Sequence, residues 1–157
     1  MVEDVISQIK FEIAQIDQLL ETYADLLDKS LKGKPDLVEI AALGSVLHSF
    51  YNGLENIFLS VAKGLDESVP AGSQWHRDLL TRMTETRMNR GPLLTTELTE
   101  RLSSYLGFRH FFRHTYSFVL EWDEMEKLVA PLMDVWKETR EALQQFLEGL
   151  PPERNGL

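Results

Sequence analysis

Apolar residues recur every three or four positions along most of this chain, which is the spacing that places side chains on one face of an α-helix. Between residues 2 and 31 the positions on this rhythm are Val5, Ile9, Ile13, Ile16, Leu20, Tyr23 and Leu27. Gly33 and Pro35 then interrupt the rhythm, and both residue types end helices. We therefore expect one long amphipathic helix over about residues 2–31.

The same rhythm resumes after this break and predicts further helices. A second helix is expected over about residues 37–65, with Asp36 as its N-cap and Glu39 in the capping-box position. The others are expected over about residues 74–89, from Thr95 or Thr96 through the stretch 105–118, and over about residues 124–149. Pro131 falls inside the last helix and predicts either a kink or a later start.

The pattern as a whole predicts an all-α protein. No alternating apolar pattern competes as a strand, and no repeat, low-complexity run or internal linker divides the chain. A hydrophobic content of 43% is ample for one core. We expect an antiparallel helical bundle of about five helices, formed as a single domain by residues 1–150, with a disordered tail at residues 151–157.

Composition excludes several classes of function. The chain has no cysteine, which excludes disulfides, thiolate nucleophiles and cysteine-based zinc sites. It has no apolar run of 18 residues, and its first residues are acidic, without the pattern of a signal peptide. We therefore expect a cytoplasmic protein that is not embedded in a membrane.

The charge is unevenly distributed. Net charge is −9, yet residues 77–113 hold seven arginines against four acidic residues, so this segment carries +3 and the remainder −12. A uniformly acidic surface would repel nucleic acid, whereas the planar guanidinium suits phosphate oxygens. The arginine-rich segment is compatible with phosphate contact and equally with a solvated helical face.

Chemistry-bearing side chains crowd into residues 105–118, where two arginines and two histidines stand among phenylalanines and tyrosines. On an ideal helix Arg109 takes a position of the apolar stripe, with Tyr116 about 20° from it and His114 about 140° away. Arg109 and His114 would then need a distortion of the helix, or a second subunit, to act together. An arginine on such a stripe is costly unless it pairs with an acid such as Glu55 or lines a cleft.

Arginine and histidine together suit cleavage of RNA without a metal. Arg109 can hold a phosphate and stabilise its charge but cannot act as a base, whereas His114 can transfer a proton near neutral pH. His110 and Arg113 are possible supporting residues. His110 and His114 have the spacing of half a metal site, but no Glu lies three residues before either one, so we expect no metal and no cofactor.

Three polar residues of the second helix are further candidates. His48, Tyr51 and Glu55 share one face of it at helical spacing, and they could support the site. The alternative is that they make hydrogen bonds between helices or face solvent.

Arg109, His114 and Tyr116 form the pattern R-x4-H-x-Y, and in this the chain resembles the HepT-type toxins of the HEPN group of helical ribonucleases. The segments 47–57 and 75–80 are also similar to that family, and the resemblance covers roughly residues 1–148. Many relatives have a small polar residue, often Asn, after the motif arginine, where this chain has His110.

The resemblance implies a homodimeric toxin that cleaves RNA at the dimer cleft without a metal, with transfer RNA as one substrate class. It also implies a cognate antitoxin, a nucleotidyltransferase of the MNT type, which inhibits the toxin by adenylylating Tyr116. The alternative hypothesis is a non-catalytic HEPN module that binds nucleotide or substrate for a nucleotidyltransferase.

Overall fold

A computed structural model describes residues 2–150, and it is helical throughout, with no strand in that range. The elements are α1 (Val2–Thr22), α2 (Ala24–Lys32), α3 (Leu37–Gly64), α4 (Trp75–Arg82), α5 (Thr96–Arg113), the 3-10 helix η1 (Ser117–Val119), α6 (Trp122–Val129) and α7 (Leu132–Gly149). The predicted all-α bundle is confirmed. The tail expected to be disordered lies outside the described residues, and the assignment of one domain stays a prediction.

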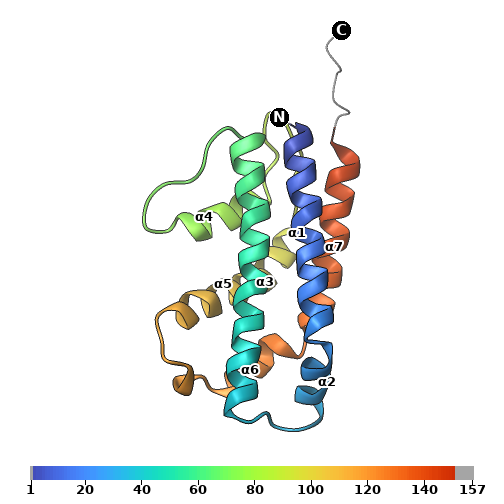
Figure 1. The fold of residues 1–157 in the computed structure, drawn as a ribbon. Helices are drawn as coiled ribbons and strands as arrows, with labels where there is room; N and C mark the ends of the chain where they lie inside the picture. Colours follow the sequence, from blue (N-terminus) through green and yellow to red (C-terminus); the bar gives the residue numbers. More distant parts are fainter. Residues whose placement is uncertain (1, 151–157) are drawn as a thin grey trace.

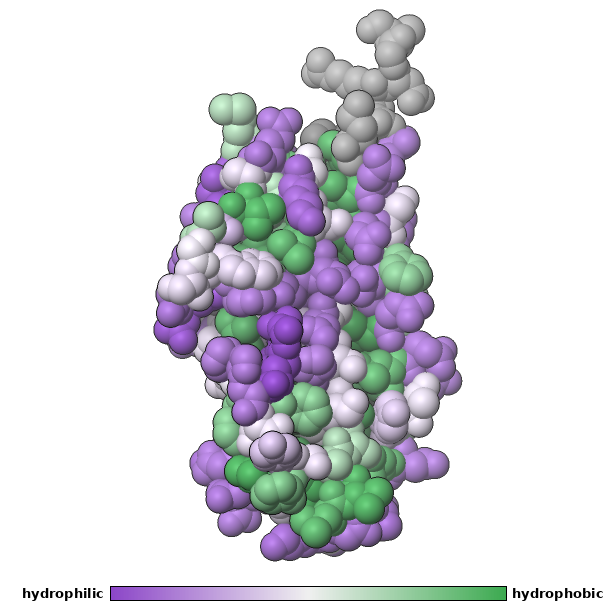
Figure 2. All heavy atoms as spheres, turned by 60° about the vertical axis from the view of Figure 1, so that its left-hand side comes forward, coloured by the Kyte–Doolittle hydropathy of each residue, from purple (hydrophilic) through white to green (hydrophobic). Residues whose placement is uncertain are grey.

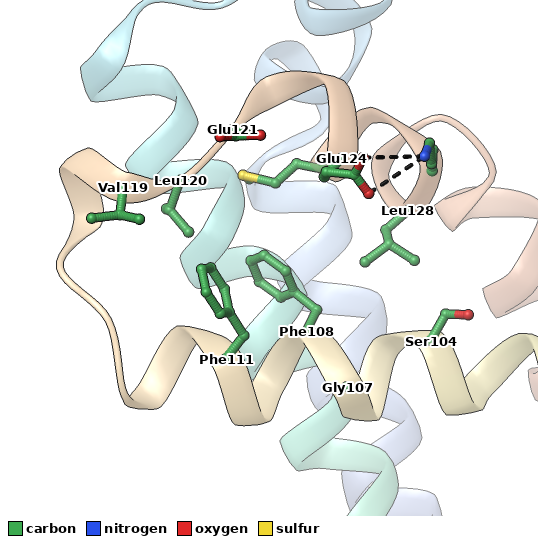
Figure 3. A pocket seen from close by; sticks show the side chains of 11 residues that line it. Ser104, Gly107, Phe108, Phe111, Val119, Leu120, Glu121, Glu124 and Leu128 are labelled. Carbon is green, nitrogen blue, oxygen red and sulfur yellow. Dashed lines mark hydrogen bonds and ion pairs between the residues drawn. The ribbon is translucent and has the colours of Figure 1, made fainter.

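Helix α3 is the central element of the bundle (Figure 1). It packs against α1, α2, α4, α5, α6 and η1, and fourteen of its 28 residues are buried. Helix α1 runs opposite to α3 and α7, whereas α5 crosses α3 at a steep angle (Figures 1 and 3). A helix buried on several sides holds the elements around it in fixed positions, and α4 and α5 are two of them.

The long first and last helices of the prediction are each divided in two. Tyr23 separates α1 from α2, although the hydrogen bonds Tyr23 N–H to Leu19 O (3.2 Å) and Leu27 N–H to Tyr23 O (3.0 Å) continue across the break. Pro131 separates α6 from α7, because proline has no N–H to continue the ladder and is tolerated only at a helix start. The later start expected from Pro131 is therefore correct.

Helix α4 ends at Arg82, seven residues earlier than expected. Beyond it the backbone turns, and the carbonyl of Met83 accepts from the N–H groups of Leu93 (2.8 Å) and Leu94 (3.1 Å). Arg87 and Arg90 also pair through their backbones. These tertiary bonds offer the chain an alternative to further helical turns, and the prediction of a helix to residue 89 was wrong for that reason.

A glycine brings the C-terminal end of α5 close to α3. A Cβ atom on Gly44 would lie 2.9 Å from the ring of Phe112 and 3.1 Å from Leu120. Only glycine leaves room for these contacts. None of the helices in residues 2–150 is long and apolar enough to cross a lipid bilayer.

Candidate functional site

Arg109 lies on α5 and is almost entirely buried, with 8% of its surface exposed. Its Nε donates to Oδ1 of Asn52 on α3, and its Nη2 lies 3.6 Å from Oε1 of Glu55 one turn further along α3. The guanidinium also lines a cleft. Both explanations offered for an arginine on the apolar stripe therefore apply, because an acid pairs with it and the stripe borders a cleft.

Glu55 contacts two side chains, one through each carboxylate oxygen. While Oε1 faces Arg109, Oε2 lies 2.8 Å from Nδ1 of His76 on α4. The carboxylate is buried, and it connects α3 to both α4 and α5. Glu55 was predicted as a possible supporting residue, and the structure places it beside Arg109.

Asn52 and His76 were not among the residues that the sequence suggested. Asn52 precedes Glu55 by three residues, so it shares a helical face with a residue that was singled out, and this spacing was an available signal. His76 is 21 residues from Glu55, and no local pattern joins the two.

His48 and Tyr51 lie behind Arg109, and neither lines the cleft. Nδ1 of His48 accepts from Nδ2 of Asn52 at 3.3 Å, and burial, followed by the charges of Arg109 and Arg113, lowers the pKa of His48 below 6.5. Tyr51 is fully buried, and that burial, with the nearby charge of Glu55, raises the pKa of its phenol far above its usual value. Both side chains therefore lie near Arg109, on the side of it away from the cleft.

Helix α5 ends at Arg113, and this corrects the geometry expected from an ideal helix. His114 is the C-cap, with φ −116° and ψ 11°, and its N–H bonds to the carbonyl of Phe111. His114 lines the same cleft as Arg109 within one chain. His110 and Arg113 line it too, and the rings of His110 and His114 are 4.7 Å apart between centroids.

Tyr116 follows the end of the helix, so the prediction that it shares a stripe with Arg109 was wrong. It immediately precedes η1, with backbone angles of extended chain. Its side chain is 75% exposed, stacks on Phe118 and does not line the cleft. The tyrosine is open to solvent, in contrast to the buried arginine of the same motif.

The cleft occupies about 1120 Å³ between α4 and α5, and the segment that leads into α4 forms one wall. Its lining includes Gln74, Trp75, His76, Arg77, Thr96, Ser103, Arg109, His110, Arg113 and His114. Figure 2 shows strongly hydrophilic side chains gathered across the middle of one face, with hydrophobic ones below them. The chemistry of the lining, cationic and imidazole groups with hydroxyls, suits an anionic ligand.

The arginine-rich segment contributes fewer cations to this cleft than its count suggests. Arg82, Arg87 and Arg90 pair with Asp66, and Arg101 pairs with Asp134 and Glu138. Within residues 2–150, Arg77 and Arg113 form no ion pair, and both line the cleft. Of the seven arginines of this segment, Arg77, Arg109 and Arg113 line the cleft.

A second depression lies on the opposite side of α5, toward η1 and α6 (Figure 3). Apolar side chains, among them Phe108, Phe111 and Leu128, form most of its lining. At its rim Lys127 pairs with Glu124 at 3.3 Å, so this cation is already neutralised. The groove therefore lacks the charge that a phosphate site needs, and the cleft of Arg109 is the stronger candidate.

Metal ligands do not gather in the described part of the chain. Residues 2–150 contain no group of three or more His, Asp or Glu side chains that could hold an ion.

The model of a family described as HepT-like protein matches residues 42–150, which include α4, α5 and the whole R-x4-H-x-Y pattern. No curated protein and no solved structure matches the chain.

Proposed function

Because this chain belongs to the HepT-like protein family, of the HEPN type, we propose that it is a toxin ribonuclease that cleaves RNA at the cleft of Arg109 and His114. One observation carries the proposal: the motif arginine and histidine line one cleft within a single chain. That geometry supplies a phosphate-binding group and a proton-transfer group on the same surface.

The reaction needs no metal in this proposal. Arg109 holds the scissile phosphate and offsets the charge that develops on its oxygens. The ribose 2′-oxygen attacks phosphorus, the bond to the 5′-oxygen breaks, and His114 transfers a proton in this exchange. Arg77 and Arg113 add positive charge to the cleft, and His110, packed on His114, limits the motion of its ring.

Tyr116 is the proposed site of inhibition, as the acceptor of AMP from a cognate nucleotidyltransferase antitoxin of the MNT type. Its exposure supports access by such an enzyme. Tyr116 follows His114 by two residues, so an attached AMP would add negative charge and bulk beside that end of the cleft. Tyr105 is a natural internal control, because its phenol is buried and donates to the carbonyl of Leu128 at 2.7 Å.

A homodimer remains part of the proposal, although it is not needed to bring Arg109 and His114 together. Exposed apolar side chains gather where α5 ends and η1 begins, namely Phe111, Tyr116, Phe118 and Val119. Such side chains offer surface to a second copy. In a symmetric dimer, two clefts would act on one RNA.

The proposal is tested with Arg109→Ala and His114→Ala, measured for growth inhibition in cells and for cleavage of transfer RNA in the presence of a metal chelator. Both variants should lose cleavage and toxicity while retaining the helical circular dichroism of the parent. A variant that stays toxic and cleaves RNA would overturn the proposal. A wild-type protein that binds nucleotide without degrading RNA would favour a non-catalytic HEPN module.

Modification is tested by intact mass after co-expression with the antitoxin. We expect added AMP on the wild type and none on Tyr116→Phe, with Tyr105 unmodified in both proteins. AMP that persists on Tyr116→Phe would contradict the assignment of the acceptor.

A further inference from the structure

A histidine outside the R-x4-H-x-Y pattern lies on the same cleft. His76 belongs to the first turn of α4, and its ring is held from two directions. Nδ1 bonds to Oε2 of Glu55 at 2.8 Å, and the ring stacks on Trp75 with centroids 3.6 Å apart and planes 29° apart. The side chain remains 31% exposed, so the ring is fixed in place and still reachable from the cleft.

The bond to Glu55 determines the tautomer of His76. A carboxylate oxygen accepts hydrogen bonds, so Nδ1 carries the proton and donates it. In the neutral form of a ring bonded in this way, Nε2 is the unprotonated nitrogen. A buried carboxylate that fixes the tautomer and orientation of an imidazole, and stabilises the imidazolium that forms during reaction, is the arrangement that general bases require.

The same carboxylate faces Arg109 through its other oxygen, at 3.6 Å from Nη2. Glu55 therefore positions the proposed phosphate-binding group and the imidazole of His76 relative to one another. Among the cleft histidines His76, His110 and His114, only His76 bonds to a carboxylate in the described structure. His110 packs against the ring of His114 instead.

We propose that His76 is the general base of RNA cleavage, a role that rests on the ribonuclease function proposed above. Nε2 of His76 removes the proton of the ribose 2′-hydroxyl as the 2′-oxygen forms its bond to phosphorus. The bond from phosphorus to the 5′-oxygen breaks, and His114 gives a proton to that leaving oxygen. The products are a 2′,3′-cyclic phosphate and a 5′-hydroxyl, and one proton has passed to His76 while one has left His114.

The decisive variant is His76→Asn. The asparagine amide can place an N–H where Nδ1 lies and keep the bond to Glu55, but it has nothing at the position of Nε2. We expect single-turnover cleavage to slow by about 10² to 10⁴-fold, the usual contribution of general acid–base catalysis, with thermal stability unchanged. Cleavage at the wild-type rate by His76→Asn would mean that His76 only supports Glu55, and would overturn the proposal.

Two further measurements distinguish a base from other roles. Added imidazole should restore part of the rate of His76→Ala, and a rate that imidazole does not raise would count against proton transfer. A substrate with sulfur in place of the 5′-leaving oxygen needs no acid, so it should rescue His114→Ala but leave His76→Asn slow. The reverse pattern of rescue would overturn the assignment of base and acid.

Control variants separate this inference from the function on which it rests. Asp78 lies on the exposed side of α4 and does not line the cleft. The Asp78→Glu variant should therefore cleave at the wild-type rate. If Arg109→Ala and His114→Ala lose cleavage while His76→Asn retains it, the role of His76 alone is wrong. If the wild-type protein does not cleave RNA, both proposals are wrong.

Discussion

Two buried arginines, Arg90 and Arg109, have similar exposure but differ in how their nitrogens are used. Arg90 donates from Nε and Nη2 to both carboxylate oxygens of Asp66, at 2.8 and 2.9 Å. Its Nη1 donates to the carbonyls of Glu85 and Gly91. Every nitrogen of this guanidinium is hydrogen-bonded within the protein. Arg90 therefore stabilises the loop that follows α4, and no nitrogen of it is left to bind a ligand.

Arg109 is bonded through Nε alone. Its Nη2 is 3.6 Å from Glu55, beyond a good hydrogen bond, and Arg109 lines the cleft. Burial and a nearby acid therefore do not distinguish a structural arginine from one that can bind an anion. The two kinds of arginine are distinguished by how many of their N–H donors already bond within the protein. Four predictions follow, in order of the size of the expected effect.

The largest effect is expected for Arg90→Ala. It leaves the buried carboxylate of Asp66 without its bidentate partner, and breaking a buried pair in this way costs about 3–5 kcal/mol of unfolding free energy. Urea denaturation measures this. The double variant Arg90→Met with Asp66→Leu should recover part of the loss, because the buried carboxylate is removed together with its bidentate partner, and Arg82 and Arg87 lose only longer contacts of 3.8 and 3.7 Å. A loss of unfolding free energy below about 1 kcal/mol in the single variant would contradict a structural role for Arg90.

The next effect is on catalysis. Arg109→Ala should reduce cleavage by about 10² to 10³-fold, which corresponds to about 2.7–4 kcal/mol of transition-state stabilisation. Its stability should fall less than that of Arg90→Ala, because Glu55 keeps its bond to His76. Arg90→Ala, assayed below its melting temperature, is the matched control and should cleave normally. Equal losses of activity in the two variants would remove the distinction between them.

Anion binding should depend on Arg109 and not on arginines that are paired away from the cleft. Inorganic phosphate at ten times its dissociation constant should stabilise the wild type by about 1.4 kcal/mol, seen as a rise in melting temperature. Arg109→Gln should lose this rise. Arg101→Gln should retain it, because Arg101 is paired with Asp134 and Glu138 away from the cleft. A rise that survives in Arg109→Gln would place the anion elsewhere.

The smallest effect concerns pH. Burial and the charges of Arg109 and Arg113 lower the pKa of His48 in the folded protein, so the unfolded chain binds the extra proton more readily. Its contribution to stability is fully present above about pH 6.5 and is lost as pH falls from there through the lowered pKa. His48→Gln should show a weaker decline of melting temperature between pH 7.5 and 5.5. An identical decline in both proteins would contradict this.

The fold was largely predictable because its signals are local. The apolar rhythm predicted α3 within one residue of its observed end, and the capping box of Asp36 and Glu39 is present with both of its hydrogen bonds, at 2.8 and 3.1 Å. The end of α5 was not predictable in this way. No glycine or proline stands near Arg113, and the helix ends where Phe112 reaches Gly44 on α3, a contact between residues distant in sequence.

The candidate site divides along the same line. Arg109 was predicted as a site residue because its charge interrupts an apolar stripe, and Glu55 was the acid expected to pair with it. The bond between Glu55 and His76 depends on how α4 packs on α3. The spacing of residues within either helix does not predict this packing. Tyr116 was misplaced because an ideal helix was continued past its real end.

The stack of Trp75 on His76 gives the protein an optical probe of its own cleft. Trp122 and Trp136 are buried at 7% and 4% exposure, whereas Trp75 is partly exposed and lines the cleft. Indole emission depends on contact with solvent and with a charged neighbour, so the fluorescence of Trp75 reports both the entry of a ligand and the protonation of the imidazole beside it. Binding and proton transfer at His76 can thus be followed in the unlabelled chain.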